Sequence, residues 1–283
     1  MLDRRQFLLL SASAAAVAIT GRAHASRDRI TASAYWSPVL GRAVPYLTYS
    51  ATGAGNSAPV LYLLHGHGGG EWDWVRAGGA IETVDQMVEA RMVPPLHIVL
   101  PGVGNSWYVD GPEPHGPMAT ALQDGLMPVV EQALAPQAAW RAVIGLSMGG
   151  FGALHLGLQE PGDWRFIGAL SPAIFRPGSD FPGFQLQLFA GAFGDPFDRA
   201  RFAAADPFNR VPALARAGER PELYLSCGTD DFFGLAVGTR AFGEALANAA
   251  VPATVLIKPG RHDWPYWRAE LPEALAALGS TVS

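Results

Sequence analysis

A serine stands at the centre of the Gly-x-Ser-x-Gly segment Gly145-Leu146-Ser147-Met148-Gly149-Gly150. The apolar residues 142–145 before it favour a buried strand, and residues 148–159 after it favour a helix. Glycines two residues before and two residues after Ser147 allow a sharp turn without Cβ clashes. Such a turn exposes the serine hydroxyl as a nucleophile and points the next N–H at a developing oxyanion. The alternative is a glycine-rich turn in an ordinary α/β domain.

A serine hydroxyl needs a base to act as a nucleophile, and the chain carries suitable partners downstream. Asp230 and Asp231 follow one expected strand, and His262 lies in a glycine-containing loop after the next. This is the order Ser, Asp, His in which α/β-hydrolases place their triad at strand ends. The histidine would take the serine proton, and the acid would fix the ring tautomer.

Other side chains compete for two of these roles. Only His262 combines a glycine-flanked loop, a preceding strand and a position after the acid. We interpret the competing histidines as packing or solvated side chains or as part of a removed segment; they are His24, His97, His115 and His155. Either aspartate could stand at the strand end. We favour Asp231 as the acid and expect Asp230 to cap the helix that follows.

An oxyanion site needs a second backbone donor, and the first glycine loop offers one. The apolar strand 60–64 leads into His65-Gly66-His67-Gly68-Gly69-Gly70. We predict that the N–H groups of His67 and Met148 bind the oxyanion. No further His, Cys or carboxylate cluster accompanies His65 and His67, so we expect no metal site. A phosphate loop is excluded because no Gly-Lys-Ser/Thr ending follows the glycines. We expect no metal or organic cofactor.

Several segments together carry a family resemblance. They are Leu63-Leu64-His65-Gly66-His67-Gly68-Gly69, Asn105-Ser106-Trp107-Tyr108-Val109, the serine segment, Cys227-Gly228-Thr229-Asp230-Asp231-Phe232 and His262-Asp263-Trp264-Pro265-Tyr266-Trp267. Over residues 30–280 the chain resembles the putative-esterase family of α/β-hydrolases, which includes esterase D, bacterial feruloyl esterases and the antigen 85 mycolyltransferases. The resemblance implies Ser147 as nucleophile, His262 as base, Asp231 as acid, and His67 and Met148 as oxyanion donors.

The chain departs from two members of that family. Antigen 85 proteins carry an Asp and an Arg in the first glycine loop for their sugar, where this chain has His65 and Gly68. Trehalose transfer is therefore not supported. Esterase D is a cytosolic enzyme, whereas the N-terminus here indicates export.

The N-terminal residues have the pattern of a targeting signal. Arg4 and Arg5 precede an apolar stretch, residues 7–20, and Ala23-His24-Ala25 fits a small-residue cleavage site. The paired arginines resemble a twin-arginine signal. We expect residues 1–25 to be removed and the rest to reach the periplasm or the medium, without stable membrane insertion. A Sec signal or an uncleaved anchor is the alternative.

Strand and helix patterns alternate along residues 26–283, which predicts one α/β-hydrolase domain with a mostly parallel sheet and helices on both faces. The expected strands are residues 43–49, 60–64, 97–100, 142–145, 166–170, 222–227 and 253–258. The expected helices are residues 80–90, 119–134, 148–159, 235–249 and 269–278. The net charge of −5 and the lack of a basic patch argue against nucleic-acid binding. The single cysteine, Cys227, excludes an internal disulfide and is expected to be a buried, inert thiol.

Aromatic side chains concentrate near the predicted site. Residues 172–210 interrupt the alternation and are rich in Phe, Gly and Pro, so they form either a substrate-binding wall or an insertion that packs on the core. Trp107, Tyr108 and Trp264 are candidate substrate-binding residues, and Trp267 could line the same pocket, although aromatic side chains near catalytic loops also serve as packing.

The sequence thus predicts an exported serine esterase that acts on a small-molecule or saccharide-linked ester through an acyl-enzyme. An acyltransferase that passes the acyl group to another hydroxyl would need the same triad. A non-catalytic binding module that keeps the fold is a more remote alternative.

Overall fold

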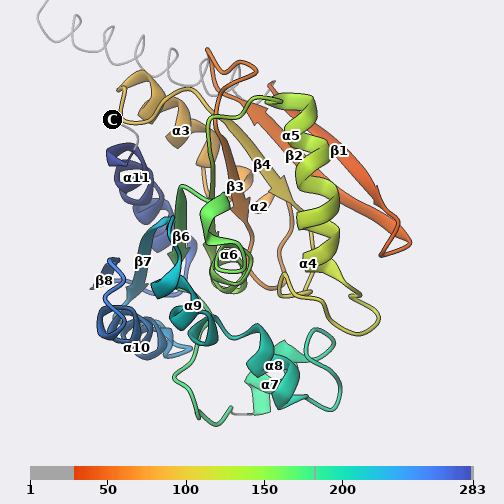
Figure 1. Cartoon of the computed structure of the whole chain (residues 1–283), viewed down its shortest axis with the longest axis vertical. Helices are drawn as coiled ribbons and strands as arrows, with labels where there is room; N and C mark the ends of the chain where they lie inside the picture. The colour runs from red at the N-terminus through yellow and green to blue at the C-terminus, as the bar shows by residue number, and fades with distance from the viewer. Residues whose placement is uncertain (1–28, 182, 282–283) are drawn as a thin grey trace, which may run out of the picture.

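The computed structural model describes residues 29–181 and 183–281, which build a central eight-stranded sheet in the order β1-β2-β4-β3-β5-β6-β7-β8 (Figure 1). Strand β2 pairs antiparallel with both β1 and β4, and all other neighbours are parallel. The strands are β1 (Ile30–Ser37), β2 (Arg42–Ser50), β3 (Val60–Leu64), β4 (His97–Pro101), β5 (Arg141–Leu146), β6 (Phe166–Leu170), β7 (Glu222–Gly228) and β8 (Thr254–Lys258). The predicted mostly parallel sheet is confirmed.

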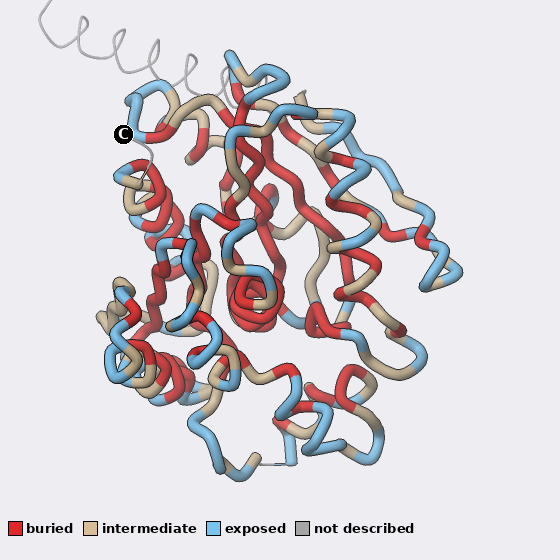
Figure 2. Tube along the Cα trace, viewed as in Figure 1, coloured by how far each residue is buried: buried red, intermediate tan, exposed pale blue. Residues whose placement is uncertain are grey.

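Helices cover both faces of the sheet (Figure 1). Their bounds are α2 (Asp73–Arg76), α3 (Ala80–Glu89), α4 (Met118–Thr120), α5 (Met127–Leu134), α6 (Met148–Gly157), α7 (Gly183–Phe189), α8 (Arg199–Ala205), α9 (Val211–Arg216), α10 (Leu235–Asn248) and α11 (Trp264–Ser280). The apolar residues of α5, α6 and α10 join one core, and those of α3 and α11 join another. Strand β5 serves both cores, because alternate side chains point to opposite faces: Val143 into the first, Ile144 into the second. Figure 2 shows the central strands of the sheet buried along their length.

Strand β1 was not predicted from the sequence. It lies at the sheet edge and pairs only with β2, and most of its residues are exposed. Its residues do alternate between apolar and polar from Ile30 to Ala34, but the alternation is short and two of its three apolar members are alanines, which are weak strand formers.

Two predicted helices differ clearly from the structure, whereas the limits of the other three lie within two residues of those predicted. Residues 119–134 form α4, a π-helical turn (Ala121–Leu126) and α5 rather than one regular helix. Pro128, in the first turn of α5, has no N–H to continue an α-helical ladder from that π turn. Helix α11 begins at Trp264 instead of residue 269. Asp263 caps it by accepting the N–H of Tyr266 at 3.2 Å, and Pro265 suits its first turn.

The segment after β6 contains short helices α7, α8 and α9, and lies beyond the carboxyl ends of the parallel strands (Figure 1). Along the described chain, no helix combines the length and apolarity needed to cross a bilayer. The predicted signal, residues 1–25, lies outside the described residues.

Candidate active site

Ser147 occupies the tight turn between β5 and α6. Its backbone has φ 54° and ψ −118°, a strained conformation for a residue with a side chain. The turn is held by the Ser147 N–H, which donates to the Leu170 carbonyl at 2.9 Å. A Cβ at Gly145 would collide with the Gly149 carbonyl, and one at Gly149 with the Leu64 carbonyl. The predicted need for glycine on both sides of the serine is therefore confirmed.

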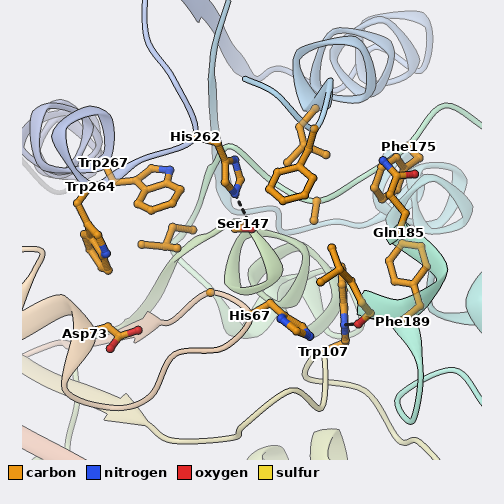
Figure 3. A pocket seen from close by; sticks show the side chains of 16 residues that line it. His67, Asp73, Trp107, Ser147, Phe175, Gln185, Phe189, His262, Trp264 and Trp267 are labelled. Atoms are coloured by element: carbon orange, nitrogen blue, oxygen red, sulfur yellow. Dashed lines mark hydrogen bonds between the residues drawn. The ribbon is translucent and has the colours of Figure 1, made fainter. Parts of the chain in front are cut away.

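Three residues predicted to act together lie together. The Ser147 Oγ is 3.0 Å from His262 Nε2 (Figure 3), and His262 Nδ1 is 2.7 Å from Asp231 Oδ2. They follow β5, β8 and β7, whose carboxyl ends share one edge of the parallel sheet. With the Nδ1–H donating to Asp231, Nε2 keeps its lone pair toward the Ser147 hydroxyl. The arrangement can therefore move a proton from serine to histidine.

The neighbouring aspartate is placed differently. Asp230 is exposed, and its carboxylate accepts only from the Thr229 hydroxyl among the described residues, at 3.4 Å. The expectation that Asp230 caps the next helix is wrong. Helix α10 begins after Gly234, which makes no side-chain cap, and Asp230 lies four residues too early to reach its N–H groups.

The Asp231 carboxylate is buried and receives three donors. His262 Nδ1 and the Cys227 thiol face Oδ2, the latter at 3.7 Å, and the Phe233 N–H donates to Oδ1 at 3.0 Å. Burial, followed by the charge of Asp231, raises the pKa of the Cys227 thiol to about 12. The predicted burial of Cys227 is confirmed, and the raised pKa favours the protonated, unreactive thiol.

Of the two predicted oxyanion donors, His67 lines the cavity beside Ser147, and Met148 follows Ser147 as the first residue of α6. Within the described chain, neither the His67 N–H nor the Met148 N–H donates to a protein acceptor. The glycine loop after β3, which carries His67, is fixed from two sides. Gly68 N–H donates to Asn105 Oδ1 at 2.7 Å, and His65 Nε2 accepts the Val103 N–H at 3.2 Å. These N–H groups can thus receive a negatively charged oxygen.

His65 is a structural residue of this loop. Its Nδ1 donates to the Gly66 carbonyl at 2.8 Å while Nε2 accepts from Val103, so both ring nitrogens are used. Burial lowers its pKa, which favours this neutral form. Among the described residues, no group of three His, Cys, Asp or Glu side chains is arranged to hold a metal ion.

A cavity of about 210 Å³ opens beside Ser147 (Figure 3). Trp107 and Trp264, both predicted as substrate-binding candidates, line it, as does Trp267. Tyr108 does not, and the prediction for it is wrong. Its ring is fully buried against Gly152, and its hydroxyl donates to the His65 carbonyl at 3.1 Å, so it supports the glycine loop from behind.

The family model described as Putative esterase matches residues 37–278. The protein belongs to the Putative esterase family. It is accordingly an enzyme, a carboxylic ester hydrolase of the serine hydrolase type.

Individual relatives of this esterase differ in their names. The acetyl esterase of Caldicellulosiruptor saccharolyticus is 28% identical, over 74% of this chain and 78% of its own. The diacylglycerol acyltransferase/mycolyltransferase Ag85B of Mycobacterium intracellulare is 25% identical, over 96% and 94%. A solved ferulic acid esterase superposes with a TM-score of 0.74 at 23% identity, over 89% of this chain and 98% of that one, which establishes the α/β-hydrolase fold.

Several cavity residues of this esterase were not singled out from the sequence. They are Asp73, Gln185, Leu188, Phe233 and Leu235. Residues 172–210 combine the two expected roles, since some of their side chains line the cavity and others pack on the core. Phe175 and Phe189 line the cavity, whereas Phe197 and Phe202 pack behind them, with centroids 5.6 Å apart. The sequence does not indicate which of the phenylalanines in this segment face the cavity.

Proposed function

We propose that the protein is an exported serine esterase that hydrolyses carboxylic esters through an acyl-enzyme on Ser147. The observation that carries this proposal is the position of His262, 3.0 Å from the Ser147 hydroxyl and 2.7 Å from the Asp231 carboxylate. A base fixed between a nucleophile and a buried acid is what acyl transfer to serine requires.

In the proposed mechanism, Ser147 Oγ attacks the ester carbonyl while His262 Nε2 takes the hydroxyl proton. Asp231 stabilises the imidazolium that forms. Collapse of the tetrahedral intermediate breaks the bond to the alcohol, which leaves with the proton from His262. Water then enters, gives a proton to His262 and attacks the acyl carbonyl. As the second tetrahedral intermediate collapses, the bond to Ser147 Oγ breaks, His262 returns the proton to that oxygen, and the carboxylic acid departs.

The tetrahedral oxyanion would lie between the His67 and Met148 N–H groups. Neither N–H group has another acceptor among the described residues. The Ser147 turn holds the Met148 N–H in place, and the glycine loop after β3 holds the His67 N–H. Each such donor contributes about 3 kcal/mol to the transition state in comparable sites. These steps require no metal ion and no organic cofactor.

An acyltransferase is the second candidate. It is favoured by the similarity to the mycolyltransferase Ag85B, which extends over 96% of this chain. Both candidates share the acyl-enzyme and differ only in whether water or an acceptor hydroxyl releases it. His65 and Gly68 stand where a sugar-binding Asp and Arg are expected for trehalose transfer, which weighs for hydrolysis.

The substrate class follows from the relatives and the cavity. Relatives are named acetyl esterase and endo-1,4-beta-xylanase/feruloyl esterase, so small-molecule and saccharide-linked esters are the proposed substrates. Nucleic acid is not a proposed partner, given the net charge of −5.

One assay tests this proposal. Purified enzyme is given nitrophenyl esters of graded acyl length beside feruloyl and acetylated-sugar esters, with and without glycerol or sugar acceptors. We expect free acid as the main product under both conditions. Acylated acceptor as the main product would establish the acyltransferase, and a folded protein that neither hydrolyses any ester nor reacts with a fluorophosphonate would indicate a binding module.

Export is proposed from residues 1–25 alone. The signal, fused to a reporter that crosses the membrane only when folded, should deliver it to the periplasm. Replacing Arg4 and Arg5 by lysine should abolish delivery. If the natural signal fails to deliver this reporter but exports one that crosses the membrane unfolded, the signal belongs to the Sec route.

A further inference from the structure

The cavity beside Ser147 has two unlike sides. In Figure 3 the labelled side chains divide into two groups on opposite sides of Ser147. One group contains Asp73, Trp264 and Trp267. The other, which we name the aromatic arm, contains Trp107, Phe175, Gln185 and Phe189. The two sides therefore suit different parts of an ester.

The aromatic arm is closely packed. The rings of Trp107 and Phe189 meet with centroids 4.8 Å apart, and those of Phe175 and Phe189 at 5.8 Å. The Trp107 indole N–H donates to the Leu188 carbonyl at 2.8 Å. Trp107 therefore presents only apolar surface to the cavity. Of the four side chains of the aromatic arm, Gln185 is the polar one.

Gln185 lies on α7 and is 7% exposed. Within the described residues, its side-chain amide makes no hydrogen bond. Gln185 lines the cavity and its amide is not fully sealed from solvent, so an occupant of the cavity can reach it. A polar group that apolar material covers without a partner is costly. A purely hydrocarbon occupant would impose that cost, whereas an occupant with a hydrogen-bonding group would avoid it.

The enclosed arm suits the acyl part of the substrate. The acyl group stays on Ser147 while the alcohol leaves and water enters, so the alcohol needs the more open side. On the arm, Trp107, Gln185 and Phe189 are buried and Phe175 is half-buried. On the other side, only Trp267 of the three is buried, and Asp73 and Trp264 are half-buried. The aromatic arm therefore holds the acyl group with its far end toward Gln185.

We propose that Gln185 is a specificity-determining residue that selects acyl groups carrying a hydroxyl or similar hydrogen-bonding group at their far end. This inference rests on the proposed acyl-enzyme function of Ser147. The shared chemistry is a polar end on an otherwise apolar acyl chain, which an aliphatic or an aromatic acid could supply.

The test uses two matched pairs of nitrophenyl esters, so the leaving group is constant. One pair is the hexanoate and ω-hydroxyhexanoate, and the other is the phenylpropanoate and para-hydroxyphenylpropanoate. In each pair the measured quantity is the ratio of kcat/KM for the hydroxylated ester to that for the plain ester. The variant is Gln185→Met, which keeps the length of the side chain and removes the amide. The matched control is Gln187→Met, because Gln187 is exposed on the same helix.

We expect a ratio of about tenfold or more in the natural enzyme for at least one pair, equivalent to one hydrogen bond. The ratio should fall to near one in Gln185→Met and stay unchanged in Gln187→Met. The pair with the larger ratio identifies an aliphatic or an aromatic acid.

Three results would overturn the inference. A ratio near one for both pairs in the natural enzyme does so without any variant. An unchanged ratio in folded Gln185→Met does so as well, and so does an equal loss in Gln187→Met. If the natural enzyme hydrolyses the plain esters through Ser147, the proposed function stands even when the inference fails. Hydrolysis that is independent of Ser147 would remove both.

Discussion

The ring of Trp267 stands at 85° to the imidazole of His262, with the two centroids 5.0 Å apart. The indole N–H donates to Ser171 Oγ at 3.2 Å, which fixes the indole in the wall of the cavity. Phe233 makes a second edge contact with His262, at 4.9 Å and 78°. These contacts and the bond to Asp231 restrict the orientation of the imidazole.

The contact predicts that Trp267 is a positioning residue for His262. Trp267→Leu should lower kcat by about 10²-fold, because a displaced imidazole no longer points at Ser147. KM should change less. Trp267→Phe keeps an aromatic edge and should recover part of the loss. Steady-state kinetics of both variants test this, and a change confined to KM would assign Trp267 to substrate binding alone.

The two neighbouring aspartates should differ sharply in their effects. Asp231→Asn should lower kcat by up to about 10⁴-fold, because the amide no longer favours the reactive imidazole tautomer. Asp230→Asn should leave kcat near its natural value. Its free energy of unfolding should change by less than about 0.5 kcal/mol, since Asp230 is exposed and caps no helix. If Asp230→Asn is the inactive variant, the assignment of the acid is wrong.

A salt bridge spans the loop that carries His262. Lys258 Nζ lies 2.6 Å from Glu270 Oε1, and the Tyr224 hydroxyl donates to Oε2 at 3.3 Å. Lys258→Met should destabilise the protein by about 2 kcal/mol, because Glu270 is buried and would lose its counter-charge. This value allows for the partly exposed lysine.

The double variant Lys258→Met/Glu270→Leu is the control for that effect. It removes both charges and should recover much of the stability, as measured by urea unfolding. Equal destabilisation of the single and the double variant would show that packing, rather than the unpaired charge, dominates.

His155 should make the protein less stable in acid. Burial lowers its pKa to about 4, and Nδ1 faces the Ala205 carbonyl at 2.9 Å while Nε2 faces Gln159 Nε2 at 3.1 Å. An unfolded histidine titrates near pH 6.5. Below that pH the unfolded chain binds a proton that the folded protein does not, so stability falls as the pH decreases from about 6.5 to about 4.

The loss attributable to His155 should reach at most about 3 kcal/mol, and the residue should contribute no pH dependence above about pH 7. His155→Asn keeps a donor for Ala205 and removes the titration. Its unfolding free energy should therefore decline less between pH 7 and 4. Parallel pH profiles for the two proteins would contradict the assigned cause.

The parts of the fold that the sequence predicts best are those buried on both faces. Strands β3 and β6 have the predicted bounds, because a short run of apolar residues leaves little choice of limits. The edge strand β1 was missed because main-chain hydrogen bonds to β2 hold it with few buried side chains.

The site shows a similar division. Ser147, Asp231 and His262 stand beside strand ends, so the topology of a parallel sheet brings them together. The direction of a side chain is harder to predict. Tyr108 is next to Trp107 in the sequence, yet only Trp107 reaches the cavity. Gln185 gave no signal at all, since only the path of residues 172–197 brings it over the cavity.

The most direct test of the account is the identity of the acylated residue. The enzyme is mixed with a nitrophenyl ester, quenched in acid within the first turnovers, digested and mapped by mass spectrometry. We expect one acyl group on Ser147, formed with a burst of nitrophenol. Folded Ser147→Ala should show neither and should lose about 10⁴- to 10⁶-fold in kcat. An acyl group on another residue, or near-natural hydrolysis by that variant, would contradict the account.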